Sequence, residues 1–251
     1  MSEFKLDNTV AVRPNKTVYR DGNYGIKVFN EGFLKSDILN EALNHARVEE
    51  TGLSVPKLIA VAQIDGKWAI VSEFIEGKTL AKLIEENPAD ESLIDRFVNI
   101  QLEIHSKSAP MLNHLLDKMN RKISESSLSD AAKYDLHTRL ESLPKHRKLC
   151  HGDFNPSNII ITPDDKYYVI DWAHATQGNA SADAARTYLL FCLHGDKKTG
   201  DRYLQLFCQK SNTAPHYVQN WLPIVAASQS VKGKPEEREF LLRWAEVVDY
   251  Q

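Results

Sequence analysis

Two short polar motifs near the middle of the chain are separated by two apolar runs. Residues 151–158 read His151-Gly152-Asp153-Phe154-Asn155-Pro156-Ser157-Asn158, and residues 169–172 read Val169-Ile170-Asp171-Trp172. The apolar runs at 159–161 and 167–170 flank a turn-forming segment at 163–166, which predicts a small β-hairpin. Because a hairpin folds back on itself, it would return Asp171 to the loop formed by residues 151–158.

Three oxygen-bearing side chains, those of Asp153, Asn158 and Asp171, would then converge. A carboxylate can receive the proton of an attacking hydroxyl, and carboxylate and amide oxygens are ligands for Mg²⁺, which bridges nucleotide phosphates. An ordinary polar turn would also explain residues 153–157. The two motifs in this order favour the catalytic interpretation, a site for phosphoryl transfer.

The two motifs resemble those of the aminoglycoside phosphotransferase and choline kinase group, within the protein-kinase-like superfamily. That group carries H-G-D-x-x-x-x-N followed by I-D-W or I-D-F, and the chain matches every letter. The resemblance implies that Asp153 is the catalytic base, that Asn158 and Asp171 hold Mg²⁺, and that His151 maintains the shape of the loop. Protein kinases read H-R-D and D-F-G at these places, so Gly152 and Trp172 favour a small-molecule kinase.

The resemblance extends to residues in the first third of the chain. Lys27 lies in a predicted strand similar to the one whose lysine reaches the nucleotide phosphates, and Glu41 lies on the following predicted helix, where it could pair with Lys27. Solvated surface charges are the alternative for both. Glu73 and Ile75 fall where the family connects its two lobes, and their backbone groups are expected to bond an adenine edge.

The turn expected to cover the phosphates lacks glycine. Kinases place glycines between their first two strands so that backbone N–H groups can approach phosphates, whereas here the turn reads Arg13-Pro14-Asn15-Lys16. Arg13 or Lys16 could substitute by charge, but a solvated hairpin turn is the favoured interpretation. The choice between ATP and GTP as donor therefore stays open.

Strand patterns precede helix patterns along the chain, which favours an α+β fold in two lobes. The strands are expected at 9–13, 17–20, 24–29, 58–64, 68–74, 159–161 and 167–170, and the helices at 36–51, 79–87, 92–105, 112–124, 129–143 and from 180 onward. We expect a small, mainly antiparallel N-lobe with one helix at residues 1–76. A larger, mostly helical C-lobe with the catalytic loop and the acceptor site is expected at 77–251.

Composition limits the classes of partner. The 251 residues carry a net charge of −3, which gives no electrostatic reason to expect nucleic acid or an anionic membrane. Three cysteines without C-x-x-C spacing predict neither a disulfide framework nor a zinc module. The N-terminal residues 1–7 show no secretory signal and no apolar run is long enough to span a membrane, so a cytoplasmic protein is expected.

Further residues of the predicted C-lobe are assigned structural roles. His105 and Asp183 match family positions. His105 is expected to be a structural histidine, and Asp183 is expected to cap or brace the loop. Trp172, Tyr217 and Trp221 could contact an acceptor, but core packing is the favoured interpretation.

The acceptor stays open between an aminoglycoside, a sugar or amino sugar, and a choline-like alcohol. Two alternatives to an active kinase remain. One is a catalytically silent module that binds nucleotide, and the other, a metal-dependent hydrolase, would need more carboxylates or histidines near the metal.

Overall fold

The structure, a computed structural model, describes residues 4–231 and 235–246. The chain packs as two compact units, each assembled from two stretches of sequence: Met1–Pro88 with Pro156–His174, and Ala89–Asn155 with Ala175–Gln251. The packing therefore groups residues 77–88 and 156–174 with the first unit. The functional division at residue 76 stays a prediction. Residues 1–3 of the N-terminal stretch, where no secretory signal is expected, lie outside the described residues.

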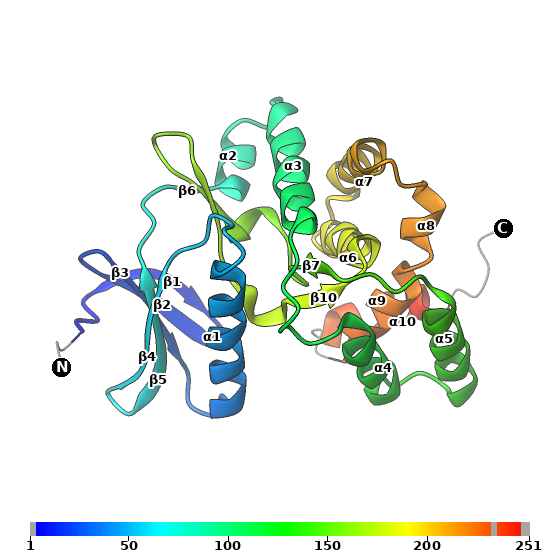
Figure 1. Cartoon of the computed structure of the whole chain (residues 1–251), viewed down its shortest axis with the longest axis horizontal. Coiled ribbons are helices and arrows are strands. Elements are labelled where there is room, and N and C mark those ends of the chain that lie inside the picture. Colours follow the sequence, from blue (N-terminus) through cyan, green and yellow to red (C-terminus); the bar gives the residue numbers. More distant parts are fainter. Residues whose placement is uncertain (1–3, 232–234, 247–251) are drawn as a thin grey trace. The chain divides into compact units, whose positions relative to one another are not determined.

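The first unit contains a five-stranded antiparallel sheet in the order β1-β2-β3-β5-β4. Its strands are β1 (Asn8–Arg13), β2 (Lys16–Asp21), β3 (Tyr24–Phe29), β4 (Leu58–Ile64) and β5 (Lys67–Glu73), and α1 (Lys35–Glu49) lies alongside them (Figure 1). The antiparallel N-lobe with one helix is therefore confirmed.

The alternation of side chains in β3 builds both faces of this sheet. Ile26 and Val28 are buried in one apolar cluster, whereas Phe29 packs on the other face with Ile38 and Ala42 of α1. Successive side chains of a strand point to opposite faces. Lys27 therefore lies on the face that α1 covers, which is the placement that matters for the site.

The remainder of the first unit is built around a second, three-stranded sheet in the order β6-β8-β9. The sheet consists of β6 (Lys78–Thr79), β8 (Ile159–Ile161) and β9 (Tyr167–Val169). This part of the unit also contains α2 (Leu80–Glu86) and short 3₁₀ turns at Pro156–Asn158 and Trp172–His174. The predicted hairpin is confirmed, since Ile159 pairs with Val169 and Ile161 with Tyr167.

The second unit is mostly helical, as expected for a C-lobe. Its helices are α3 (Ser92–Ser106), α4 (Leu115–Glu125), α5 (Asp130–Ser142), α6 (Ala180–Leu193), α7 (Lys197–Ser211), α8 (Pro215–Gln219), α9 (Leu222–Ser230) and α10 (Pro235–Glu246). Two three-residue strands that the sequence does not predict, β7 (Lys148–Cys150) and β10 (Thr176–Gly178), pair with each other. They hold the two ends of the segment that carries the motifs.

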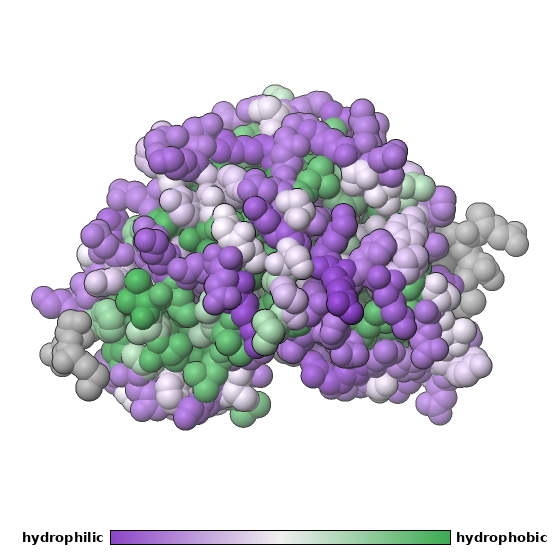
Figure 2. Space-filling view, viewed as in Figure 1, coloured by the Kyte–Doolittle hydropathy of each residue, from purple (hydrophilic) through white to green (hydrophobic). Residues whose placement is uncertain are grey.

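Apolar side chains gather over the five-stranded sheet (Figure 2), whose two edge strands carry the exposed Val10, Val12 and Ile59. Cys150, Cys192 and Cys208 are free thiols. Within the described ranges, no helix combines the length and the apolar character that crossing a bilayer requires.

Gly77 is required where the chain enters β6. A Cβ at this position would lie 2.3 Å from the backbone oxygen of Ile161, the β8 residue that pairs with Lys78. We expect Gly77→Ala to lower the free energy of unfolding by about 2 kcal/mol, because the methyl group must push the two strands apart. Urea denaturation measures this loss.

Gly25→Ala is the matched control, because a Cβ there would meet its neighbours only at 3.7 Å, an ordinary contact. Equal unfolding midpoints for the two variants would contradict the assigned role of Gly77.

Candidate active site

A cluster of charged side chains joins three elements of the first unit. Nζ of Lys27, on β3, lies 2.5 Å from Oε1 of Glu41 on α1 and 3.3 Å from Oδ1 of Asp171, which follows β9. Glu41 is buried, and the other two side chains are about one-fifth to one-quarter exposed. The lysine and the glutamate are therefore not the solvated surface charges of the alternative interpretation.

The ammonium group of Lys27 stays charged in this setting. Burial alone would lower its pKa, but the carboxylates of Asp171 and Glu41 raise the pKa of Lys27 above its ordinary value. A fixed positive charge on this face suits the binding of an anionic group such as a phosphate.

Lys16 joins the same cluster from the turn between β1 and β2. Its Nζ lies 2.8 Å from Oδ2 of Asp171, with only 22% of its side chain exposed. The expectation of a solvated turn is therefore wrong for Lys16, because its side chain is committed to a carboxylate 155 residues away. Arg13, at the other end of the turn, is exposed.

The two residues expected to hold metal lie next to each other in the first unit. The backbone N–H of Ile170 donates to the carbonyl of Asn158 at 2.9 Å, so the hairpin returns Asp171 beside the 3₁₀ turn that ends at Asn158. Asp171 adopts a φ of 67°, a left-handed conformation that costs a non-glycine residue roughly 1 kcal/mol. Such strain is common where a side chain must be presented in one direction.

Asp153 belongs to the second unit, within a loop held by its own hydrogen bonds. Its backbone N–H donates to Nδ1 of His151 at 3.2 Å, and its carbonyl accepts from the side-chain amide of Asn155 at 3.0 Å. Gly152 has a φ of 77°, which explains a glycine at this place in the motif. The convergence of Asp153 with Asn158 and Asp171 stays a prediction.

A buried carboxylate on α6 stabilises this loop by accepting hydrogen bonds from its backbone. The oxygens of Asp183 accept the backbone N–H of Gly152 at 2.7 Å and that of His151 at 3.2 Å, together with Nε2 of His105 at 3.0 Å. Burial would raise the pKa of Asp183, but the hydrogen bond from His105 and the charges and donors around it lower the pKa to about 2. The structural roles expected for His105 and Asp183 are confirmed.

Comparison with known proteins identifies a family for the chain. The family model described as "Phosphotransferase enzyme family" matches residues 15–221, which is most of the chain. The chain belongs to this phosphotransferase family. No curated protein sequence matches it.

Solved structures share the fold of this phosphotransferase. A thermostable mutant of aminoglycoside phosphotransferase APH(4)-Ia, in complex with AMP-PNP and hygromycin B, matches with a TM-score of 0.69 and 14% identity, over 94% of this chain and 89% of that one. An aminoglycoside-3'-phosphotransferase of type VIII gives 0.67 and 14%, over 91% and 96%. Choline kinase LicA from Streptococcus pneumoniae gives 0.59 and 17%, over 98% and 89%.

Arg186 is a residue of the site that the sequence analysis misses. Its guanidinium donates to Oδ1 of Asp153 at 3.2 Å, to the carbonyl of Gly152 at 2.5 Å and to Oε1 of Gln229 at 2.6 Å. A signal was present, because Arg186 lies three residues after Asp183 and therefore on the same face of a helix. In this phosphotransferase, α6 thus holds the loop through a carboxylate and a guanidinium together.

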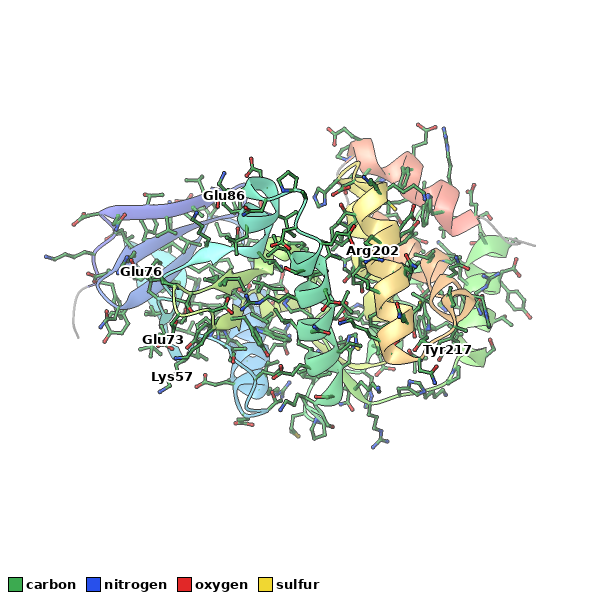
Figure 3. All side chains as sticks on the ribbon, turned by 90° about the horizontal axis from the view of Figure 1, so that it is seen from above. Lys57, Glu73, Glu76, Glu86, Arg202 and Tyr217 are labelled. Carbon is green, nitrogen blue, oxygen red and sulfur yellow. The ribbon has the colours of Figure 1, made fainter. Side chains whose placement is uncertain are left out.

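The segment expected to contact the nucleotide base begins at the last residue of β5. The backbone N–H of Glu73 is already donated to the carbonyl of Lys57 at 2.8 Å, and the two residues lie side by side in Figure 3. Neither backbone group of Ile75 bonds to another residue in the part of the chain that the structure describes. The carbonyl of Glu73 accepts a hydrogen bond from the hydroxyl of Ser72 at 3.4 Å. Both groups of Ile75 thus remain for a purine edge, and the use of this segment stays a prediction.

The aromatic residues considered for the acceptor are mainly core residues. Trp172 and Trp221 are each 1% exposed, which confirms the core interpretation for both. The hydroxyl of the half-buried Tyr217 accepts from the side-chain amide of Asn179 at 2.7 Å. No group of three or more His, Cys, Asp or Glu side chains suited to a metal occurs among the described residues.

The buried Asp183 gives a testable prediction. Asp183→Asn should lower the free energy of unfolding by about 3 kcal/mol at pH 7, because several buried donors lose an ionised acceptor. The folded-state pKa lies below the ordinary value of 3.8, so this contribution is present above pH 4 and is lost as the pH falls from about 4 to 2. Urea denaturation at a series of pH values measures it.

The control is Asp201→Asn, which removes an exposed carboxylate paired with Lys197 at 2.7 Å and should cost less than about 1 kcal/mol. A pH-independent loss at Asp183, or a loss no larger than that of the control, would contradict the bracing role.

Proposed function

We propose that this phosphotransferase transfers the γ-phosphoryl group of ATP or GTP to a hydroxyl of a small molecule. Asp153 would act as the catalytic base, and Asn158 and Asp171 would hold Mg²⁺. The observation that carries the proposal is the cluster of Lys27, Glu41 and Asp171 beside Asn158, because it joins fixed positive charge to oxygen donors in one unit.

The residues at hand fit a divalent cation of this kind. Asn158 and Asp171 offer amide and carboxylate oxygens, the donors that Mg²⁺ takes together with water and substrate phosphates. The carboxylate of Asp171 is held by two ammonium groups, at 2.8 and 3.3 Å, so it is already directed at positive charge. When bound, Mg²⁺ supplies neutralisation of the charge on the phosphates.

Each protein group then has a defined task. Lys27, held in place by Glu41, would contact the nucleotide phosphates. Asp153 would accept the proton of the acceptor hydroxyl, and Arg186 would orient that carboxylate while its remaining donors hold Gly152 and Gln229. Catalysis of this type consists mainly of positioning and electrostatic stabilisation, which a rigid loop provides.

The acceptor we propose is an aminoglycoside, a sugar or amino sugar, or a choline-like alcohol. The support is the fold shared with structures named for aminoglycoside and choline phosphorylation, one of them in complex with hygromycin B.

We also propose that the protein is water-soluble and resides in the cytoplasm.

The test is an acceptor panel assayed for ADP or GDP release with Mg²⁺. Hygromycin B, other aminoglycosides, amino sugars and choline are offered with ATP and then with GTP. We expect turnover on at least one acceptor and its loss in EDTA. Asp153→Asn should lower kcat at least about 100-fold, because the base is removed, while nucleotide binding is unchanged.

Asp164→Asn, on the exposed β8–β9 turn, is the control and should retain the wild-type rate. Full activity in Asp153→Asn would refute the assigned base. Nucleotide binding without turnover on any acceptor would favour a catalytically silent module.

A further inference from the structure

The turn between β1 and β2 is anchored at two points. The backbone N–H of Asn30 donates to the carbonyl of Asn15 at 3.0 Å, and its side-chain amide donates to the carbonyl of Pro14 at 2.9 Å. Pro14 and Asn15 are therefore both fixed to the segment that follows β3. The backbone of Lys16, the next residue, is held in a defined position from which its side chain extends.

The charges around Asp171 make Lys16 the more easily released of its two lysine partners. The cluster contains two ammonium groups and two carboxylates, so its formal charge is zero. Lys27 keeps Glu41 as a partner if Asp171 turns to a metal ion. Within the described ranges, Asp171 is the one carboxylate paired with Lys16, so the same change leaves the Lys16 ammonium without a counter-charge.

The turn also lacks the feature by which kinases approach phosphates in this place. Glycine allows backbone N–H groups to come close to a phosphate, and Pro14 has no N–H at all. A lysine side chain is longer and carries a full charge, so it can reach a phosphate from a turn whose backbone cannot.

We propose that Lys16 is a second phosphate-binding cation of the nucleotide site, and that its ammonium group exchanges between Asp171 and the phosphates of the bound nucleotide. The inference rests on the proposed function, since it needs a nucleotide at this site. The charge of the Lys16 side chain takes the place of the backbone N–H groups that other kinases use to bind phosphates. Lys16 is then a determinant of the affinity for di- and triphosphates over the nucleoside.

The first test is nucleotide binding in the presence of Mg²⁺, the condition under which Asp171 is expected to release Lys16. Titration calorimetry compares ATP, ADP and adenosine on the wild type and on Lys16→Ala. We expect the variant to bind ATP and ADP at least roughly 10-fold more weakly, since a charged hydrogen bond to phosphate is lost. Adenosine, which has no phosphate, should bind equally to both proteins.

Two matched variants control for other causes. Lys67→Ala removes an exposed lysine next to the β4–β5 turn of the same sheet, and it should leave all three affinities unchanged. Lys16→Gln keeps the length of the side chain without its charge, and it should reproduce the loss seen with alanine. Thermal unfolding of each variant verifies that it is folded.

A double variant separates direct contact from an indirect effect of Asp171. Lys16→Ala leaves the Asp171 carboxylate with less counter-charge, which would itself repel phosphates. In an Asp171→Asn background this repulsion is absent, so a loss that persists there supports phosphate contact. A loss that vanishes there, or equal ATP affinities for wild type and Lys16→Ala, would overturn the proposal for Lys16 alone. A wild type that binds none of the three ligands would overturn the nucleotide site itself.

Discussion

The carboxylate of Asp171 needs positive charge on both of its oxygens, and this need organises the first unit. Lys27 on β3 and Lys16 at the start of β2 supply that charge, and Glu41 on α1 fixes Lys27 in turn. A half-buried carboxylate without such partners would be costly. The sheet, the helix and the β8–β9 hairpin are therefore held to one arrangement by the same group that we assign to the metal.

A separate constraint organises the second unit. The buried Asp183 gathers backbone donors from the loop that carries Asp153, and Arg186, one turn further on α6, holds the side chain of Asp153 itself. Phe154 of this loop stacks on Phe97 with ring centroids 4.4 Å apart, so apolar packing fixes the loop as well. Each half of the proposed machinery is thus pre-organised within its own unit.

Local patterns were sufficient to predict most of the longer strands and helices. Strands β3 and β4 have the predicted bounds, and α3 differs from its predicted range by one residue, because alternation and helical spacing act over neighbouring residues. Strands β7 and β10 were missed because each has three residues and exists through its pairing with the other, as between Cys150 and Thr176. Propensity carries little information over so short a run.

The site was predictable to the extent that its residues lie in motifs. Glu41 and Lys27 were found through resemblance, and their ion pair is present. The contact of Lys16 with Asp171 could not be predicted, because it joins residues 155 positions apart through a turn of ordinary composition. Arg186 gave only a weak signal, since a helical spacing of three from Asp183 also describes many solvent-exposed arginines.

The most direct measurement is a crystal structure of the protein with Mg²⁺ and AMP-PNP. The account predicts a cation about 2.1 Å from oxygens of both Asn158 and Asp171, with the Lys16 ammonium moved from Asp171 to a phosphate oxygen. A nucleotide-bound metal ion held by other residues, while Asp171 keeps both lysine partners, would contradict it.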